Sequence, residues 1–269
     1  MTGVAGEKVT SFTDQGPFTV RFGWGLDDLA ALAPGVTTVV VVDVLRFTTA
    51  VSVAVGRGAH VLPFSWRDQR AGEFAAERHA ELAGRRGDPE RRWSLSPADL
   101  AAIPPGTRLV LPSPNGATLS AAAVELGVPT LMAGCPRNAT AVGRAAAADL
   151  ADGGRLAVIA SGERWPDALG VTHRGPLRPA VEDLLGAGAV LTRAVAAAGL
   201  DDTAVSLEAR AAIAAFDAAA PRLHADLRAC ASGRELLALG WDDDIAAAAV
   251  LDAENVAPRL VDGAFTAAG

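Results

Sequence analysis

The chain of 269 residues is half hydrophobic and carries a formal net charge of −7. This length and composition can bury a large core, and the acidic balance lacks the basic footprint of a nucleic-acid-binding protein. Lys8 is the single lysine and lies in a polar N-terminal segment, which argues against Schiff-base and P-loop mechanisms. That segment lacks the apolar core of a signal peptide, and no apolar run reaches the length of a membrane span. We therefore expect a cytoplasmic protein that binds neither membranes nor nucleic acids.

Short apolar runs alternate with helical patterns along the chain. The strands are predicted at residues 18–22, 36–42, 60–63, 108–111, 130–133, 155–160 and 256–261. The helices are predicted at 27–32, 47–55, 67–83, from 97, and at 117–126, 138–151 and 179–198, with loops at 85–96 and 161–178. This alternation indicates a three-layer α/β/α domain with a largely parallel or mixed central sheet. We expect one domain over 1–269, with a flexible tail at 1–15 and a mainly helical segment at 200–250.

Polar residues follow the central strand directly. Four valines, residues 39–42, are β-branched and predict a strand that is buried on both faces. Asp43, Arg46, Thr48 and Thr49 come next. A buried charge is costly unless it is paired, hydrogen-bonded or bound to a metal, and open α/β sheets bind ligands at the carboxyl ends of their strands. This stretch therefore predicts an active site around Asp43 and Arg46.

Each of these residues also has a purely structural interpretation. Asp43 either accepts hydrogen bonds from backbone amides of the next helix, or serves as a Mg²⁺ ligand or nucleophile. Arg46 either forms an ion pair with Asp43 or clamps a phosphate or carboxylate. Thr48 and Thr49 either begin the helix or contact an anion at its N-terminus.

Other predicted strands also end in polar groups. These groups are Ser113, Asn115 and Gly116 after one strand, Gly134 and Asn138 after another, and Ser161, Gly162 and Glu163 after a third. If the strands are parallel, all these groups gather at one edge of the sheet. The alternatives are a plain turn at Asn115-Gly116, an N-cap at Asn138 and a plain loop before Glu163.

The ordered motifs resemble the 2-phosphosulfolactate phosphatase family. They are Asp43-Val44-Leu45-Arg46 with Thr48-Thr49, Asn115-Gly116, Gly134 with Asn138, Ile159 to Gly162, and Glu182-Asp183 followed by Ala187-Gly188. The similarity runs in order from about residue 36 to 190. The sequence departs from the family pattern at Ser96-Pro97, where only these two residues of a longer motif survive, and at Pro114 and Ala117 beside the Asn-Gly turn.

The resemblance implies a Mg²⁺-dependent phosphatase with an α/β/α fold. Its expected substrate is 2-phospho-3-sulfolactate, which carries phosphate, carboxylate and sulfonate groups, and its expected products are 3-sulfolactate and phosphate. On this hypothesis Asp43 and Arg46 are catalytic. The substrate-binding residues are Arg46, Thr48, Thr49, Asn115, Gly116, Asn138, Ser161 and Gly162, and the metal ligands are Asp43, Glu163 and Asp183.

A second hypothesis is a non-catalytic binder of small phosphorylated acids, or a phosphatase with a different small anionic substrate. The altered surroundings of Ser96-Pro97 and Asn115-Gly116 motivate it. Hydrolysis measured across a panel of phosphorylated hydroxy acids, with Mg²⁺ and then with EDTA, separates the hypotheses. The sequence has no physical signal for the oligomeric state, and a homodimer is a guess.

Overall fold

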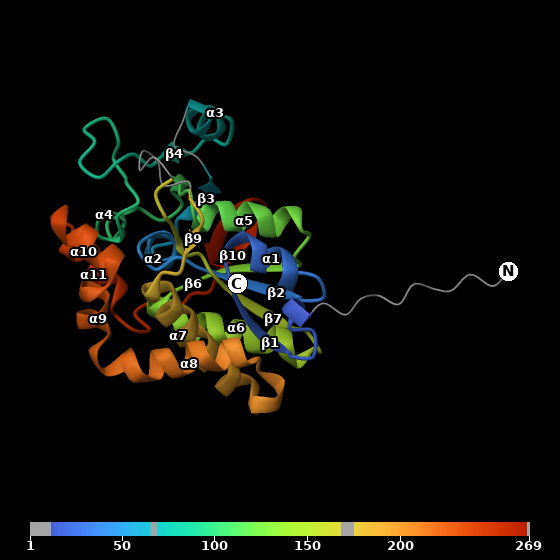
Figure 1. The fold of residues 1–269 in the computed structure, drawn as a ribbon. Coiled ribbons are helices and arrows are strands. Elements are labelled where there is room, and N and C mark those ends of the chain that lie inside the picture. The colour runs from blue at the N-terminus through green and yellow to red at the C-terminus, as the bar shows by residue number, and fades with distance from the viewer. Residues whose placement is uncertain (1–11, 66–68, 168–174, 268–269) are drawn as a thin grey trace.

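The computed structural model describes residues 12–65, 69–167 and 175–267 (Figure 1). The strands are β1 (Val20–Trp24), β2 (Thr38–Val42), β3 (His60–Phe64), β4 (Glu81–Leu82), β5 (Arg108–Pro112), β6 (Thr130–Gly134), β7 (Leu156–Ala160), β8 (Glu163–Arg164), β9 (Leu177–Arg178), β10 (Pro258–Val261) and β11 (Ala264–Ala267). The α-helices are α1 (Gly25–Leu32), α2 (Phe47–Gly56), α3 (Gln69–Glu77), α4 (Pro97–Leu100), α5 (Gly116–Glu125), α6 (Ala139–Ala151), α7 (Val181–Ala198), α8 (Leu207–Ala219), α9 (Leu223–Ala229), α10 (Ala231–Ala238) and α11 (Asp242–Ala248). Four short 3-10 helices complete the described elements: η1 (Phe12–Asp14), η2 (Pro136–Asn138), η3 (Asp202–Ala204) and η4 (Ala220–Arg222).

The central strand β2 separates two hydrophobic cores. Every residue of β2 is buried, as the β-branched run predicts. Because side chains alternate along a strand, Val40 and Val42 pack with α6, α7 and α8, whereas Val39 and Val41 pack with α1, α2 and α5. Figure 1 shows α1 and α5 above β2 and α6 and α8 below it. The prediction of an α/β fold with helices on both sides of a central sheet is confirmed.

Within the described residues, the main sheet has nine strands in the order β1-β7-β2-β6-β10-β11-β3-β5-β4. β1, β7, β2 and β6 form one parallel group, and β3, β5 and β4 form another. The antiparallel hairpin β10–β11 joins the groups through the pairs Arg259–Met132 and Phe265–Val61. Three antiparallel steps therefore separate the groups, so β5 runs opposite to β2. The sheet is mixed.

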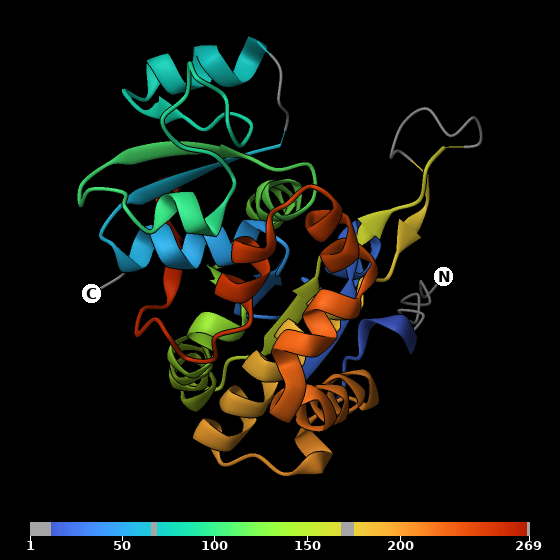
Figure 2. The same ribbon diagram turned by 90° about the vertical axis from the view of Figure 1, so that its left-hand side faces the viewer.

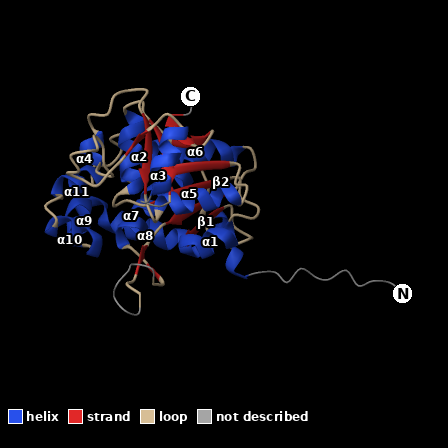
Figure 3. Ribbon diagram, turned by 90° about the horizontal axis from the view of Figure 1, so that it is seen from above, coloured by secondary structure: helices blue, strands red, loops and turns tan. Residues whose placement is uncertain are grey.

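The C-terminal half of the chain adds a helical cap. The predicted helical segment at 200–250 is confirmed by α8 to α11, with α8 packed along α7. The side of the molecule that carries these helices, orange in colour, faces the viewer in Figure 2. Seen from above, α9, α10 and α11 cluster with α4 at one end of the molecule (Figure 3). We call α9 to α11 the cap, and it supplies part of the site described below.

The structure differs from the predicted elements in three parts of the chain. The helix predicted at 67–83 was wrong in its second half: α3 ends at Glu77, and β4 follows because it can extend the sheet beside β5. The loop predicted at 161–178 contains the β8–β9 pair. A final strand, β11, pairs with β10 and was not predicted, because its short run gives no period that separates it from a loop.

Residues 1–11 of the predicted tail and residues 66–68 lie outside the described residues, and residues 12–14 form η1. No helix in the described ranges combines the length and apolarity needed to cross a membrane.

Close packing of α7 against α8 gives a stability prediction. A Cβ added at Gly188 of α7 would overlap the carbonyl oxygen of Ala212 and lie 2.6 Å from Cβ of Phe216. The backbone of Ala212 cannot shift away from the added methyl group as the end of a flexible side chain could. We expect Gly188→Ala to lower the free energy of unfolding by about 1–3 kcal/mol, measured by urea denaturation.

Gly72 of α3 is the matched control, because a Cβ there would meet no atom within 4 Å. Gly72→Ala should leave stability unchanged or raise it by up to about 1 kcal/mol, since alanine favours the helix. Equal effects of the two substitutions would contradict the packing argument.

Candidate active site

Asp43 lies at the carboxyl end of β2 with its carboxylate turned inward. Its Oδ2 accepts a hydrogen bond from the Gly116 amide at 2.8 Å, and its Oδ1 accepts one from the Phe47 amide at 3.2 Å. The Ser113 hydroxyl lies 3.5 Å from Oδ2. Backbone donors therefore satisfy this buried charge, and the Asp43–Arg46 ion pair is not the arrangement observed.

The Gly116 amide reaches Asp43 only because Gly116 has no side chain. A Cβ at this position would lie 2.8 Å from Oδ2 of Asp43 and would overlap the ring of Phe47. Asn115-Gly116 thus brings the end of β5 against the end of β2, although the two strands run in opposite directions. Five strand steps separate them, and a twist of about 20–25° per step turns β5 by roughly 100° relative to β2.

The threonines after Arg46 hold the loop instead of lining a cavity. The Thr48 hydroxyl donates to the Asp43 carbonyl at 2.8 Å, and the Thr49 hydroxyl donates to the Val44 carbonyl at 2.7 Å. Both side chains are fully buried. These contacts agree with the helix-start interpretation.

Asp183 joins the two acidic loops from the first turn of α7. Its Oδ1 accepts from the Val44 amide at 2.7 Å, and its Oδ2 accepts from the Gly162 amide at 2.9 Å. Gly162 has a φ of +63°, and a Cβ there would lie 2.8 Å from Cδ1 of Leu177. Asp183 therefore holds the loops that carry Asp43 and Glu163 in a fixed relation.

Glu163 lies across from Asp43 and is held by an amide. The Asn115 side chain donates to Oε2 of Glu163 at 3.0 Å. Burial raises the pKa of Glu163 to about 7, and repulsion from Asp43 adds to that increase. Glu163 is thus half ionised near neutral pH.

Four carboxylates, Asp43, Glu163, Glu182 and Asp183, share this region. Burial raises the pKa of Asp43 and of Asp183, and repulsion between the two raises that of Asp183 further. Glu182 is 2% exposed and its charge opposes ionisation of the other three. Acidic residues are common in the first turn of any helix, so Glu182-Asp183 at the start of α7 does not by itself signal this role.

Two of these carboxylates, those of Asp43 and Glu163, line a cavity of about 300 Å³, which we call the carboxylate cavity. Among the described residues, its wall combines the strand ends with the cap. It is lined by Asp43, Leu45, Arg46, Leu95, Ser113, Pro114, Asn115, Glu163, Ser232, Glu235, Leu236, Leu239 and Trp241. Sequence reasoning identified Asp43, Arg46, Ser113, Asn115 and Glu163 as polar groups near strand ends, and it missed the cap residues.

Arg46 is held in the cavity wall by the cap. Its Nη1 donates to Oδ2 of Asp244 at 2.6 Å, and its guanidinium carbon lies 4.6 Å from the centre of the Trp241 ring. Asp244 is fully buried and also accepts from the Ser96 hydroxyl. The surviving Ser96-Pro97 motif therefore supports Arg46 indirectly, while Ser96 also caps α4 through the Asp99 amide.

The remaining predicted residues are close to the site but are not part of the cavity wall. Asn138 is fully buried, donates to the Ala133 carbonyl and accepts from the Cys135 amide. It occupies the N-cap position of α6, as the N-cap interpretation predicts, although its side chain makes no hydrogen bond to that helix. Ser161 is buried, and its amide donates to the Val42 carbonyl. Substrate contacts by Asn138 and Ser161 stay predictions.

The donor set fits a hard cation such as Mg²⁺. Within the described ranges, no three His, Cys, Asp or Glu side chains converge to hold one ion. Mg²⁺ usually takes one or two carboxylates and completes its shell with water and substrate phosphate, so the pair Asp43 and Glu163 is sufficient. Asp183 does not line the cavity, and its hydrogen bonds connect the loops of Asp43 and Glu163; its role as a metal ligand stays a prediction.

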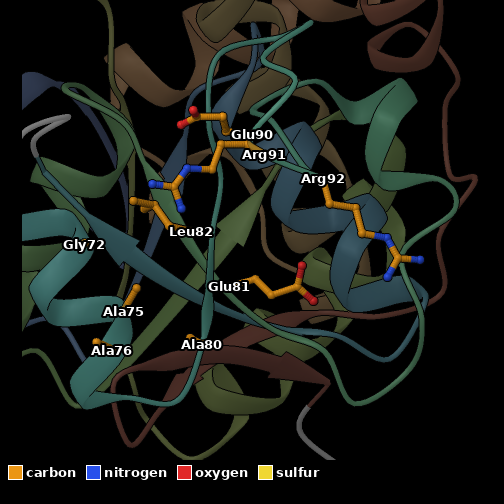
Figure 4. Close-up of a pocket in the computed structure, with 9 residues that line it drawn as sticks. All are labelled: Gly72, Ala75, Ala76, Ala80, Glu81, Leu82, Glu90, Arg91 and Arg92. Atoms are coloured by element: carbon orange, nitrogen blue, oxygen red, sulfur yellow. The ribbon is translucent and has the colours of Figure 1, made fainter.

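A separate cavity of about 380 Å³ lies against α3 and β4 (Figure 4). Its charged wall residues are Glu81, Glu90, Arg91 and Arg92, and the two arginine side chains point to opposite sides in Figure 4. None of the predicted site residues lines it, so the carboxylate cavity is the candidate active site.

Comparison with protein families identifies the family of the chain. The model of the 2-phosphosulpholactate phosphatase family matches residues 29–263, which include every residue of the carboxylate cavity. A comparison with curated proteins finds no match. The family is one of phosphoric monoester hydrolases. With nearly its whole length matched, the chain belongs to the 2-phosphosulpholactate phosphatase family.

Proposed function

We propose that the chain hydrolyses the phosphate ester of 2-phospho-3-sulfolactate in the carboxylate cavity, with Mg²⁺ held by Asp43 and Glu163. The observation that carries this proposal is the meeting of the buried Asp43, the half-buried Glu163 and one arginine in a single cavity. Family membership supports the substrate. The negative charges of Asp43 and Glu163 suit a metal ion, and the positive charge of Arg46 suits the phosphate.

Asp43 acts as a metal ligand in this proposal. Both of its oxygens accept backbone hydrogen bonds, from Phe47 and Gly116, which lowers their nucleophilicity but leaves a lone pair on each for a cation. Glu163 supplies the second carboxylate, and Asn115 fixes its orientation. A Mg²⁺ ion held by these two carboxylates would neutralise phosphoryl oxygens and lower the pKa of a bound water molecule.

Arg46 binds the phosphate from the opposite wall. Its side chain is 12% exposed, and its guanidinium stacks on Trp241 and donates from one nitrogen to Asp244. A planar guanidinium fixed in this way offers its remaining N–H groups to phosphoryl oxygens. Charge that develops on the phosphoryl group during transfer is stabilised by such a fixed donor.

Removal of the Asp43 charge tests the metal-ligand assignment. We expect Asp43→Asn to lower kcat for phosphate release by about 100-fold or more and to abolish the difference between Mg²⁺ and EDTA. Asp27→Asn is the matched control, because Asp27 is an exposed residue of α1. Phosphate release can be followed with 2-phospho-3-sulfolactate as substrate.

Retained Mg²⁺-dependent turnover in Asp43→Asn would remove Asp43 from the mechanism. Binding of 2-phospho-3-sulfolactate by the unaltered chain without any hydrolysis would instead favour the non-catalytic binder.

The raised pKa of Glu163 predicts a pH-dependent metal affinity. With a pKa of about 7, Glu163 is protonated below that pH and cannot ligate a cation. We expect Mg²⁺ affinity, measured by calorimetry, to increase as the pH rises from 6 to 8. Glu163→Gln should bind more weakly and lose this increase.

The raised pKa of Glu163 also predicts how the stability of the metal-free chain depends on pH. The usual glutamate pKa is 4.5, so between about 4.5 and 7 the folded form keeps a proton that the unfolded form has released. Stability from Glu163 is therefore present below about pH 4.5 and is lost as the pH rises through 7. Glu163→Gln should flatten this part of the profile, and an unchanged slope would contradict the assigned pKa.

A further inference from the structure

A second cavity adjoins the carboxylate cavity. It has a volume of about 330 Å³ and shares three wall residues, Arg46, Leu95 and Trp241, with its neighbour. We call it the arginine cavity. Because these residues face both cavities, a small molecule that fills the first can extend one substituent into the second.

The two cavities differ in charge. The described residues that line only the arginine cavity are Gly84, Arg85 and Arg86. No acidic residue is among its described lining residues, whereas Asp43, Glu163 and Glu235 all line the carboxylate cavity. A second anionic group of a substrate would be repelled by those three carboxylates and attracted towards the arginines.

Of the three arginines that line the arginine cavity, Arg85 has the guanidinium that is most available to bind an anion. It is exposed, and its guanidinium has no hydrogen bond or ion pair within the described part of the chain. Its backbone is fixed, since the Gly84 amide donates to the Trp93 carbonyl and the Asp88 amide donates to the Arg85 carbonyl. The loop thus presents a free cation at a defined place on the rim.

Arg86 and Arg46 are oriented by the cap. Arg86 pairs with Asp243 through both terminal nitrogens, and its Nη1 lies 3.5 Å from Oδ2 of Asp244. Trp241 lies beneath both arginines, with ring-centre distances of 5.9 Å to Arg86 and 4.6 Å to Arg46. The cap therefore sets the spacing of two of the three guanidinium groups.

We infer that the arginine cavity is a sulfonate subsite, in which Arg85 is the specificity-determining residue and Arg46 and Arg86 complete the wall. The inference rests on the proposed function, since it needs the phosphate of the same molecule to lie beside Asp43 and Glu163. A sulfonate has three equivalent oxygens and remains ionised at all ordinary pH values. Donors from separate arginines can meet those oxygens, whereas a carboxylate is satisfied by one bidentate arginine.

Arg85→Gln tests the subsite against two substrates. One is 2-phospho-3-sulfolactate, and the other is 2-phospholactate, which keeps the phosphate and carboxylate but lacks the sulfonate. We expect the ratio of their kcat/KM values to fall about tenfold in the variant, mainly through KM, as for the loss of one charged hydrogen bond. Titration calorimetry with the product 3-sulfolactate should show a similar loss of affinity.

Arg57→Gln is the matched control. Arg57 is exposed at the C-terminal end of α2, the end opposite Arg46, and its removal changes the net charge equally. This variant should keep the substrate ratio of the unaltered chain. Equal unfolding midpoints for both variants exclude a folding defect.

The failures of the two proposals are distinguishable. An unaltered chain that hydrolyses neither substrate overturns the proposed function. An active chain whose substrate ratio is the same with and without Arg85 overturns the sulfonate subsite alone. Equal losses for both substrates in Arg85→Gln contradict the sulfonate assignment as well, because the arginine would then act on a group that both substrates share.

Discussion

The hydrogen bond from the Gly116 amide to the buried Asp43 carboxylate joins two parts of the sheet that the backbone pairing keeps apart. β2 and β5 belong to strand groups of opposite direction, and in the described part of the sheet the pairing between these groups runs through the β10–β11 hairpin. A charged carboxylate inside a protein must find donors, and the backbone of α2 and α5 provides them. This requirement holds the acidic wall of the cavity together, and the two backbone hydrogen bonds offset part of the increase in the pKa of Asp43 that burial causes.

The opposite wall depends on a second buried carboxylate, Asp244. It binds Arg46 and Ser96, which lie in segments far apart in the sequence, and it lies close to Arg86. Removal of one partner from such a buried network leaves the charge of another partner uncompensated, which is strongly destabilising. The site is therefore divided by charge: the strand ends supply the carboxylates, and the cap orients the arginines. A substrate with several anionic groups matches this division.

The sequence predicted those parts of the site that depend on local order. The four valines before Asp43 identify a buried strand, and polar residues after several strands identify the edge where ligands bind. Arg46 could be identified as a candidate, but its partner could not, because Asp244 is 198 residues away and no periodicity connects them. The reversal between the strand groups was equally hidden, since it comes from the pairing of a C-terminal hairpin with Met132 and Val61. Local patterns carry little information about such long-range pairing.

In the proposed mechanism, Asp43 and Glu163 share one divalent cation opposite Arg46. A crystal structure with Mn²⁺ in place of Mg²⁺ would locate this ion by anomalous scattering. We expect one strong peak within coordination distance of both carboxylates, and loss of that peak in Asp43→Asn. A peak elsewhere, or a peak that persists in Asp43→Asn, would show that the two carboxylates do not share an ion.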